Sequence, residues 1–197
     1  LHLLALASEL GFAKEQISID TMNEISMATP NLCRLAPAGE HYIEELEDAG
    51  GISAVIRELI DGGLFDGSAM TAALFTQDEL TRGARVRDAA IIRPLDAPYS
   101  PYGGLAILKG NLAREGAVVK KSAVDPKMYR HSGPARVFDS EEAAMEAISS
   151  NQICAGDVVV IRYEGPKGGP GMREMLSPTS SIVGAGLGDT VALITDG

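Results

Sequence analysis

The sequence predicts a mixed α/β protein in which a helical part, residues 1–84, precedes a β-rich part, residues 85–197. Two observations lead to this division. Apolar side chains before residue 85 recur with the 3.6-residue period of helices, and after it short β-branched runs alternate with turn residues. Because these strands are short and few helices separate them, we expect a compact β/β/α domain and not alternating βαβ units.

The helical part begins with an apolar run over residues 1–10, followed by Gly11, which suits a helix C-terminus. Asp20 is a plausible N-cap for a helix that continues to Met27 and is stopped by Pro30. Two more helices, separated by a pair of glycines, are predicted over residues 41–48 and 52–60. The acidic residues 44–48 are expected to form a solvated helix face.

The β-rich part contains six predicted strands, bounded by turn residues. One helix interrupts them over residues 141–149, with Asp139 or Ser140 as its N-cap. The strands are predicted over residues 89–92, 105–108, 117–120, 135–138, 158–163 and 191–195.

Length and charge exclude several classes of protein. At 197 residues the chain can bury one good core or two small ones. Its net charge of −10 argues against a nucleic-acid partner, because binding phosphates needs a basic surface. No apolar stretch is long enough to cross a bilayer, and the first residues lack a charged leader. We therefore expect a cytoplasmic protein with neither a nucleic-acid nor a membrane partner.

The feature with the most chemical information is a glycine-rich turn after the strand at 158–163, with a single carboxylate, Glu174, beyond it. The turn over 165–171 lacks the Gly-Lys-Ser/Thr ending of a phosphate loop, and the glycines of 184–189 do not match a dinucleotide fingerprint. Nucleotide binding is therefore disfavoured. The plainer alternative is a structural turn with a solvated glutamate.

The cysteines and histidines give weak signals. Cys33 and Cys154 lie far apart without the spacing of a metal site, and each is expected to be a buried thiol. Among the histidines, His2 is expected in a core or interface, His41 at the surface, and His131 in a structural loop.

Several segments, taken together and in order, carry a resemblance to a known family. These segments are Thr29-Pro30-Asn31-Leu32, Ala49-Gly50-Gly51-Ile52, Ile92-Arg93-Pro94-Leu95-Asp96, Gly103-Gly104-Leu105-Ala106, Gly110-Asn111-Leu112-Ala113, His131-Ser132-Gly133-Pro134, Gly171-Met172-Arg173-Glu174-Met175 and Thr195-Asp196-Gly197. Through them the chain resembles the dihydroxy-acid dehydratases, a family that also includes the sugar-acid dehydratases. Collinear agreement of this kind is far more specific than one motif.

For the fold, the resemblance implies that residues 1–84 are the helical C-terminal part of a cluster-binding N-terminal α/β domain. Residues 85–197 would belong to a swivelling, β-barrel-like C-terminal domain that closes over the active site. Since both ends look cut, we expect an internal piece of a longer enzyme, homodimeric when complete.

For the chemistry, the resemblance implies that Glu174 is a Mg²⁺ ligand, with the other ligands upstream of the chain. An iron–sulfur cluster, 2Fe–2S or 4Fe–4S, would also have its ligands outside the chain. The proton-accepting serine is expected just beyond Gly197, so no catalytic residue lies within the chain. Met175 and Pro178 are expected to line the substrate entrance.

The expected activity is that of a hydro-lyase converting 2,3-dihydroxy acids, of the 2,3-dihydroxyisovalerate type, to 2-keto acids in valine and isoleucine biosynthesis. Two alternatives stay open: a sugar-acid dehydratase for aldonate or phosphogluconate, and a non-catalytic swivel module. The fragment alone is expected to be inactive. One departure from the family concerns residues 68–76, where Thr-Val-Thr-Gly-Lys-Thr is usual, so contacts made there by relatives do not carry over.

Overall fold

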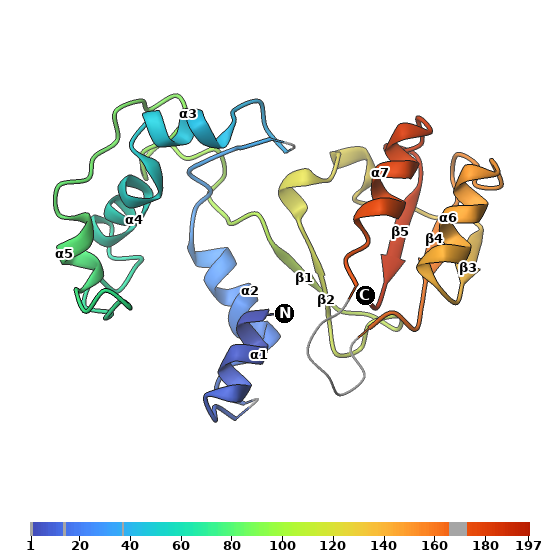
Figure 1. Ribbon diagram of the computed structural model, residues 1–197, viewed down its shortest axis with the longest axis horizontal. Helices are drawn as coiled ribbons and strands as arrows, with labels where there is room; N and C mark the ends of the chain where they lie inside the picture. Colours follow the sequence, from blue (N-terminus) through green and yellow to red (C-terminus); the bar gives the residue numbers. More distant parts are fainter. Residues whose placement is uncertain (1, 14, 37, 166–172) are drawn as a thin grey trace. The chain divides into compact units, whose positions relative to one another are not determined.

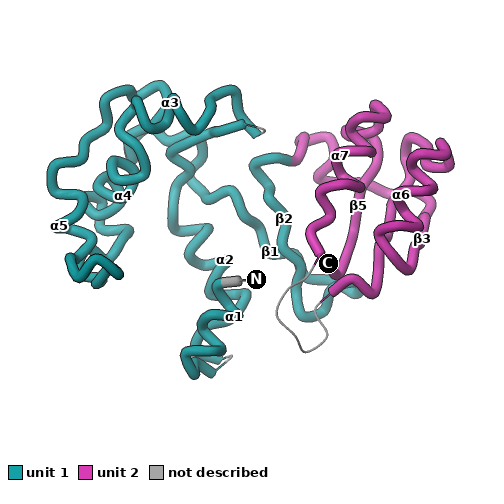
Figure 2. Tube along the Cα trace, in the orientation of Figure 1, with its two compact units in different colours: residues 1–123 teal, residues 124–197 magenta. Residues whose placement is uncertain are grey.

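The computed structural model describes residues 2–13, 15–36, 38–165 and 173–197. The chain forms two compact units (Figure 2), which we call unit 1, residues 1–123, and unit 2, residues 124–197. Figure 1 labels the elements in chain order. None of the helices in the described part of the chain has the length and apolar character that crossing a membrane requires.

Unit 1 begins with two helices, α1 (His2–Glu9) and α2 (Ile19–Ala28). Gly11 has a φ of +82° just after α1, as predicted for a residue that ends a helix. The predicted cap of α2 was wrong, because Ser18 and not Asp20 precedes the helix. The Ser18 hydroxyl accepts the backbone N–H groups of Asp20 at 3.2 Å and Thr21 at 3.3 Å. Asp20 instead lies in the first turn, where its charge favours the helix dipole.

Two further helices, α3 (Ile43–Asp48) and α4 (Gly51–Asp61), contribute to the core of unit 1. Between them, Gly50 has a φ of +132°, and a Cβ there would meet the Arg85 carbonyl oxygen at 2.5 Å. The core consists of the buried residues Leu46, Ala49, Ala54, Ile91 and Ile92.

The strand predicted over residues 89–92 is wrong. Ile91 and Ile92 are buried in a turn, where Asp88 accepts the N–H of Ala90 at 2.8 Å, and Ile92 forms only an isolated bridge with Cys33. The apolar pair resembled a strand because burial alone does not distinguish a turn from a strand. These two isoleucines pack on residues 46–54, so the core of unit 1 extends across the predicted domain boundary at 84/85.

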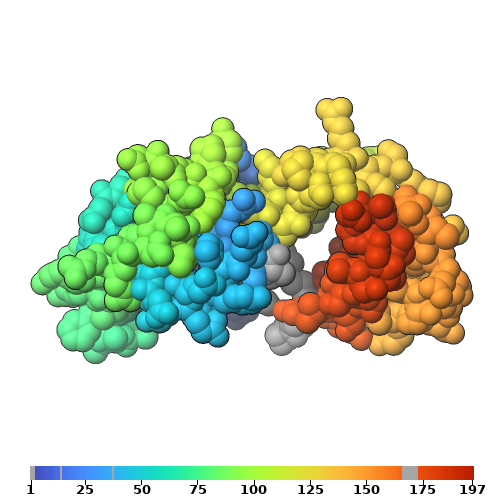
Figure 3. All heavy atoms as spheres, turned by 90° about the horizontal axis from the view of Figure 1, so that it is seen from above, coloured from blue at the N-terminus to red at the C-terminus, as the bar shows by residue number. Residues whose placement is uncertain are grey.

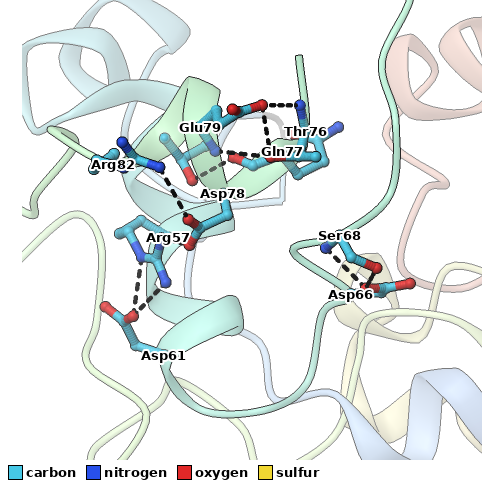
Figure 4. A network of polar contacts seen from close by, with 10 residues as sticks. Arg57, Asp61, Asp66, Ser68, Thr76, Gln77, Asp78, Glu79 and Arg82 are labelled. Carbon is cyan, nitrogen blue, oxygen red and sulfur yellow. Dashed lines mark hydrogen bonds and ion pairs between the residues drawn. The ribbon is translucent and has the colours of Figure 1, made fainter. Parts of the chain in front are cut away.

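A short helix that the sequence analysis missed, α5 (Gln77–Thr81), packs on α4. Figure 4 shows the contacts that join them: Arg57 of α4 lies between Asp61 and Asp78, with its Nη1 2.7 Å from Asp78 Oδ1. Thr76 caps α5 by accepting the N–H of Glu79. The turn before this helix includes Leu74, which is 82% exposed and has a φ of +62°.

A hairpin completes unit 1. Strands β1 (Ala106–Leu108) and β2 (Ala117–Val119) pair antiparallel close to their predicted positions, and a 3-10 helix follows at Lys121–Ala123. The Ser26 hydroxyl donates to the Leu105 carbonyl oxygen at 2.7 Å and thereby joins α2 to the hairpin. Apolar side chains of α1 and of the residue after it are exposed, with Leu3, Leu6 and Leu10 at 65%, 59% and 76%.

Unit 2 contains a parallel sheet in the order β3-β4-β5, formed by β3 (Ala135–Phe138), β4 (Val158–Ile161) and β5 (Ala192–Thr195). A 3-10 helix at Pro126–Met128 precedes the sheet. Helix α6 (Glu141–Ser149) connects the first two strands and α7 (Leu176–Gly184) the last two. The preference for β/β/α over alternating βαβ units is thus wrong for this unit. The apolar runs were identified as strands, but their composition does not determine whether neighbouring strands are parallel or antiparallel.

The two helices and the sheet of unit 2 share one core. Helix α6 has its predicted bounds, and Ser140 is its N-cap, accepting the N–H of Ala143 at 3.1 Å. In the space-filling view of Figure 3 the orange and red segments, which include α6 and α7, pack side by side. The core contains Ala144, Ala147, Ile148, Ile153, Val159, Ile161, Met175, Ile182 and Val191.

The loop before β3 approaches the loop before β4 very closely. A Cβ on Gly133 would overlap the carbonyl oxygen of Gly156, which itself has a φ of +93°. His131 stabilises the same approach, because its Nε2 lies 3.1 Å from the Gly156 carbonyl oxygen and 3.3 Å from that of Asp157. These contacts agree with the structural loop role predicted for His131.

Candidate functional site

The carboxyl ends of β3, β4 and β5 lie at one edge of the sheet, because the strands are parallel. In open α/β sheets, ligands bind at this edge. The residues that follow the strands are polar: Asp139 follows β3, Arg162 and Glu164 follow β4, and Asp196 follows β5. This edge of unit 2 is therefore the candidate site.

The Asp196 carboxylate holds the turn after β4. It accepts the backbone N–H of Tyr163 at Oδ2 and that of Glu164 at Oδ1, both at 3.1 Å. Tyr163 has a φ of +67°, which ends the strand two residues earlier than predicted. Gly165 lies so close that a Cβ would stand 2.5 Å from the Asp196 carbonyl oxygen. The start of the glycine-rich turn is thus tied to the end of β5.

Arg173 binds three carboxylates at the same edge. Its Nη2 lies 2.8 Å from Glu141, and its Nη1 lies 2.8 Å from Glu142 and 3.3 Å from Glu164. The side chains of Glu141 and Glu164 are only 11% and 10% exposed. Buried carboxylates need such partners, because burial penalises an unpaired charge.

These ion pairs also affect protonation. The pKa of the Arg173 guanidinium is raised, first by its hydrogen bond to Glu142 and further by the charges of all three carboxylates. Glu164 also accepts the N–H of Glu141, the first residue of α6, at 2.7 Å. The Arg173 network, as we call Arg173 with Glu141, Glu142 and Glu164, thus joins the start of α6, the end of β4 and the segment before α7.

A second ion pair at this edge joins Arg162 and Asp139, the residues after β4 and β3. The Arg162 guanidinium also lies 4.9 Å from the centroid of the Tyr163 ring. Both side chains of this pair are half or more exposed, so solvent screens it more than the Arg173 network.

Glu174, the predicted metal ligand, follows Arg173 directly and lies just before α7. Its side chain is exposed and, within the described part of the chain, forms no hydrogen bond or ion pair. Residues 166–172, the centre of the predicted glycine-rich turn, lie outside the described residues.

Met175 and Pro178, predicted at the substrate entrance, are buried. Met175 is 8% exposed and belongs to the core of unit 2, and Pro178 is among its fully buried side chains. Met175 packs in the core that the sheet and helices of unit 2 share, and contact of either residue with substrate stays a prediction. Gly197 lies nearby: a Cβ on it would stand 3.1 Å from the Arg173 carbonyl oxygen and 3.1 Å from Met175 Cε.

The remaining candidates lie elsewhere. Cys33 is partly buried, and burial raises the pKa of its thiol. Cys154 is exposed, so the expectation of a buried thiol is wrong for it. His41 is partly exposed and pairs with Glu45 at 3.1 Å, whereas the side chain of His2 lies outside what the structure describes.

The residues present fit the two expected cofactors differently. Glu174 has an exposed carboxylate that pairs with none of the described residues, and such a carboxylate suits a hard cation such as Mg²⁺ as one ligand of several. The described residues contain no group of three or more His, Cys, Asp or Glu side chains placed to hold a metal. Cys33 and Cys154 belong to different units, and neither has companion ligands, so the described chain does not fit an iron–sulfur cluster.

Comparison with known proteins decides the family. Residues 90–197 match the C-terminal domain of dihydroxy-acid/6-phosphogluconate dehydratases, and residues 1–79 match the N-terminal domain. The chain belongs to this dehydratase family. The first matched region ends at residue 79 and the second begins at residue 90, whereas the compact units divide after Ala123. The predicted domain boundary at 84/85 stays a prediction.

Relatives in this dehydratase family are similar along the whole chain. Proteins described as dihydroxy-acid dehydratase from Acetivibrio thermocellus and Clostridium beijerinckii are each 59% identical over 197 residues, and one from Nitratidesulfovibrio vulgaris is 60% identical over 199. In each comparison all of this chain is covered, but only 35% of the relative. The chain thus spans about a third of the length of these relatives.

The Arg173 network and the contacts of Asp196 were not predicted from the sequence. The available signal was position, since a polar residue directly after a parallel strand lies at the ligand-binding edge. This signal can be used only when β3, β4 and β5 are known to be parallel, and a parallel sheet was not predicted from the sequence.

Proposed function

We propose that this chain is part of a dehydratase that converts a 2,3-dihydroxy carboxylic acid into a 2-keto acid in branched-chain amino-acid biosynthesis. The observation that carries the proposal is the identity of about 59% along all 197 residues to proteins described as dihydroxy-acid dehydratase. The matched family also includes 6-phosphogluconate dehydratases, so a sugar acid is the alternative substrate. A small dihydroxy acid is the partner, and the whole protein is a cytoplasmic homodimer.

In this proposal Glu174 is a Mg²⁺ ligand at the carboxyl edge of the sheet. When bound, the ion supplies an electrophile that holds the substrate carboxylate and stabilises the enolate-like charge formed as the C2 proton leaves. Glu174 contributes one negative oxygen ligand, and the other ligands come from the rest of the protein. Its exposure, and the fact that no described residue pairs with it, support this role.

The neighbours of Glu174 would fix where its carboxylate can reach. The Arg173 network holds the backbone on one side, and the first turn of α7 holds it on the other. The close approach of Gly197 to the Arg173 carbonyl oxygen supports the placement of the proposed serine, which would follow Gly197, near Glu174. Such a serine is a weak base and needs nearby positive charge to accept a proton.

The iron–sulfur cluster of the proposal, 2Fe–2S or 4Fe–4S, has its ligands outside the 197 residues. The swivelling, barrel-like domain that the resemblance implies for residues 85–197 is likewise part of the proposal. The sheet of unit 2 and its polar edge would then be the portion of that domain that faces the substrate.

The test uses the whole protein that contains this chain. The measurement is 2-keto acid formed from 2,3-dihydroxy-3-methylbutanoate and, separately, from 6-phosphogluconate, at a series of Mg²⁺ concentrations. Glu174→Gln keeps the size of the side chain but removes its charge, so Mg²⁺ affinity and turnover should both fall, by more than the roughly 10–100-fold typical of outer-shell changes. Glu115→Gln, an exposed carboxylate of unit 1, is the matched control.

Two results would count against the proposal. Turnover of 6-phosphogluconate alone would assign the chain to the sugar-acid branch. A Glu174→Gln enzyme with unchanged Mg²⁺ dependence would show that this glutamate is only a solvated surface residue. For the 197-residue chain alone, we expect no turnover of either acid.

A further inference from the structure

Unit 1 contains a pocket of about 460 Å³ beside the extended segment that follows α2. We call it the Asn31 pocket. Its size lies within the range of small-molecule sites. The lining residues are Asn31, Cys33, Arg34, Leu35, Ala36, Ala38, Gly104, Leu105, Lys120 and Ser122.

The backbone around the pocket is held in place by hydrogen bonds. Asn31 donates its N–H to the Ser100 carbonyl oxygen at 2.9 Å and accepts the N–H of Tyr99 at 2.9 Å. Ser122 donates its N–H to the Gly104 carbonyl oxygen at 3.3 Å. The absence of a side chain at Gly104 keeps the pocket open, because a Cβ there would stand 2.8 Å from Ser122 Oγ and 3.7 Å from Asn31 Nδ2.

Four polar side chains that line the pocket have hydrogen-bonding or ion-pairing groups without a partner among the described residues. Asn31 Oδ1 is the buried side-chain oxygen that has no hydrogen-bond partner among the described residues. The Ser122 hydroxyl forms no hydrogen bond, and Arg34 and Lys120 form no ion pair, within the same part of the chain. The Arg34 and Lys120 cations, the Ser122 hydroxyl and the Asn31 Nδ2 amide are donors gathered in one pocket, which indicates an anionic ligand, whereas Asn31 Oδ1 is itself an acceptor that an anion leaves without a partner.

The charge of the pocket identifies the ligand. Arg34 and Lys120 are cations, and none of the described residues that line the pocket is acidic, in contrast with a chain of net charge −10. The Arg34 guanidinium lies 5.8 Å from the centroid of the Tyr99 ring, a contact that orients it without neutralising it. The remaining wall is aliphatic, with Leu35 and Leu105. An anion with a short apolar tail satisfies both parts.

We propose that the Asn31 pocket binds a small aliphatic carboxylate. Arg34 and Lys120 receive the carboxylate, the Ser122 hydroxyl and the Asn31 amide donate to it, and Leu35 and Leu105 contact the tail. This site goes beyond the proposed dehydration and does not depend on it, since the pocket would bind the acid even if Glu174 held no metal.

The experiment titrates the 197-residue chain with 3-methylbutanoate and follows binding by calorimetry. Two matched probes separate the contributions: 3-methylbutanamide has the same shape without the charge, and acetate has the charge without the tail. We expect saturable binding of 3-methylbutanoate, weaker binding of acetate, and none of the amide. Inorganic phosphate tests whether the pocket accepts any anion.

Variants locate the site. Arg34→Gln and Lys120→Gln should each weaken binding about three- to tenfold, because each removes one charge-assisted contact. Gly104→Ala should weaken binding, because its Cβ would stand 2.8 Å from the Ser122 hydroxyl that donates to the ligand. Lys109→Gln removes the same charge from the same hairpin but lies outside the lining, since Lys109 pairs with Asp20 at 2.6 Å, so binding should be unchanged.

The two cysteines give an independent readout. Cys33 lines the pocket and Cys154 is exposed in unit 2, so bound 3-methylbutanoate should slow alkylation of Cys33 by N-ethylmaleimide and leave that of Cys154 unchanged. Equal binding of the amide and the acid, tighter binding of phosphate than of the acid, or full binding by Gly104→Ala would each overturn the proposal. So would the absence of saturable binding to a chain whose circular dichroism shows that it is folded.

Discussion

Arg173 and Glu141 form an ion pair of 2.8 Å in which the carboxylate is almost fully covered and the guanidinium is half exposed. The pair joins two helices through their N-terminal ends, because Glu141 begins α6 and Arg173 lies shortly before α7. Glu174, the proposed metal ligand, therefore follows a residue whose side chain is fixed in three directions. This arrangement has consequences that can be measured.

Arg173→Gln in the whole protein should lower turnover on the order of 10–100-fold, because a small displacement of Glu174 is enough to misplace a metal ligand. The Mg²⁺ concentration at half-maximal activity should rise as well. Arg173→Lys should recover part of the loss, since it keeps the charge but not the forked geometry. Arg162→Gln removes the same charge at the same sheet edge and should change Mg²⁺ dependence little. If both glutamine variants behave alike, Arg173 does not position Glu174.

Acid should destabilise unit 2 through Asp157. This carboxylate is nearly buried, and its pKa lies below the ordinary 3.8, first because it accepts the N–H of Cys154 and then because Arg136 lies 3.1 Å away. A carboxyl whose pKa is lowered by folding stabilises the fold above the unfolded-state pKa, and this contribution is lost as the pH falls through the folded-state pKa. The loss should therefore begin near pH 4 and grow below it.

Asp157→Asn removes that titration and keeps an oxygen acceptor for Cys154. The variant should be less stable than the wild-type chain at pH 7, and the difference should shrink as the pH falls below 4. Urea unfolding at pH 7, 5, 4 and 3 measures the free energy of unfolding of the wild-type chain and of the variant at each pH. A difference that stays constant over this range would exclude Asp157 as the source.

Leu74→Gly should stabilise unit 1 by about 0.5–1 kcal/mol. The φ of +62° at Leu74 costs a side-chain-bearing residue about 1–2 kcal/mol, and glycine avoids this cost but loses more entropy on folding. Little packing is lost, because Leu74 is 82% exposed. Ala73→Gly, at a neighbour whose φ is not positive, should destabilise instead. Urea unfolding of the 197-residue chain measures both, and a destabilised Leu74→Gly would contradict the assignment of strain.

Ser18→Ala should destabilise unit 1 by about 1 kcal/mol, because it removes the oxygen that caps α2. Asp20→Ala should cost less than about 0.5 kcal/mol, since it removes only an exposed ion pair with Lys109 and a favourable charge in the first turn. Thermal unfolding followed by circular dichroism compares the two. If Asp20→Ala destabilised unit 1 more than Ser18→Ala, Asp20 and not Ser18 would be the cap of α2.

Local features of the fold could be predicted from the sequence. The strand Ala135–Phe138 and the helix Glu141–Ser149, with Ser140 as cap, lie where their composition and capping residues place them. These signals work because they act within a few residues. The same reasoning identified Glu174 only through resemblance to a family, since a single exposed glutamate carries no local signal.

Features that depend on partners distant in sequence could not be predicted. The parallel order of β3, β4 and β5 depends on where α6 and α7 return the chain, and strand composition does not encode that. Ile91 and Ile92 resembled a strand because they are apolar, but they are buried by residues 46–54. The Arg173 network joins residues on both sides of β4, and so it becomes visible only in three dimensions.

The close approach of Gly133 to the carbonyl oxygen of Gly156 has a consequence for reading relatives of this protein. Any larger residue at position 133 would separate the loops that lead into β3 and β4, so packing alone restricts this position to glycine. A relative that keeps this backbone path is therefore expected to keep a glycine at the equivalent position. This glycine would be retained equally in a paralogue that had lost all catalytic activity, and so it is a marker of ancestry and not of chemistry.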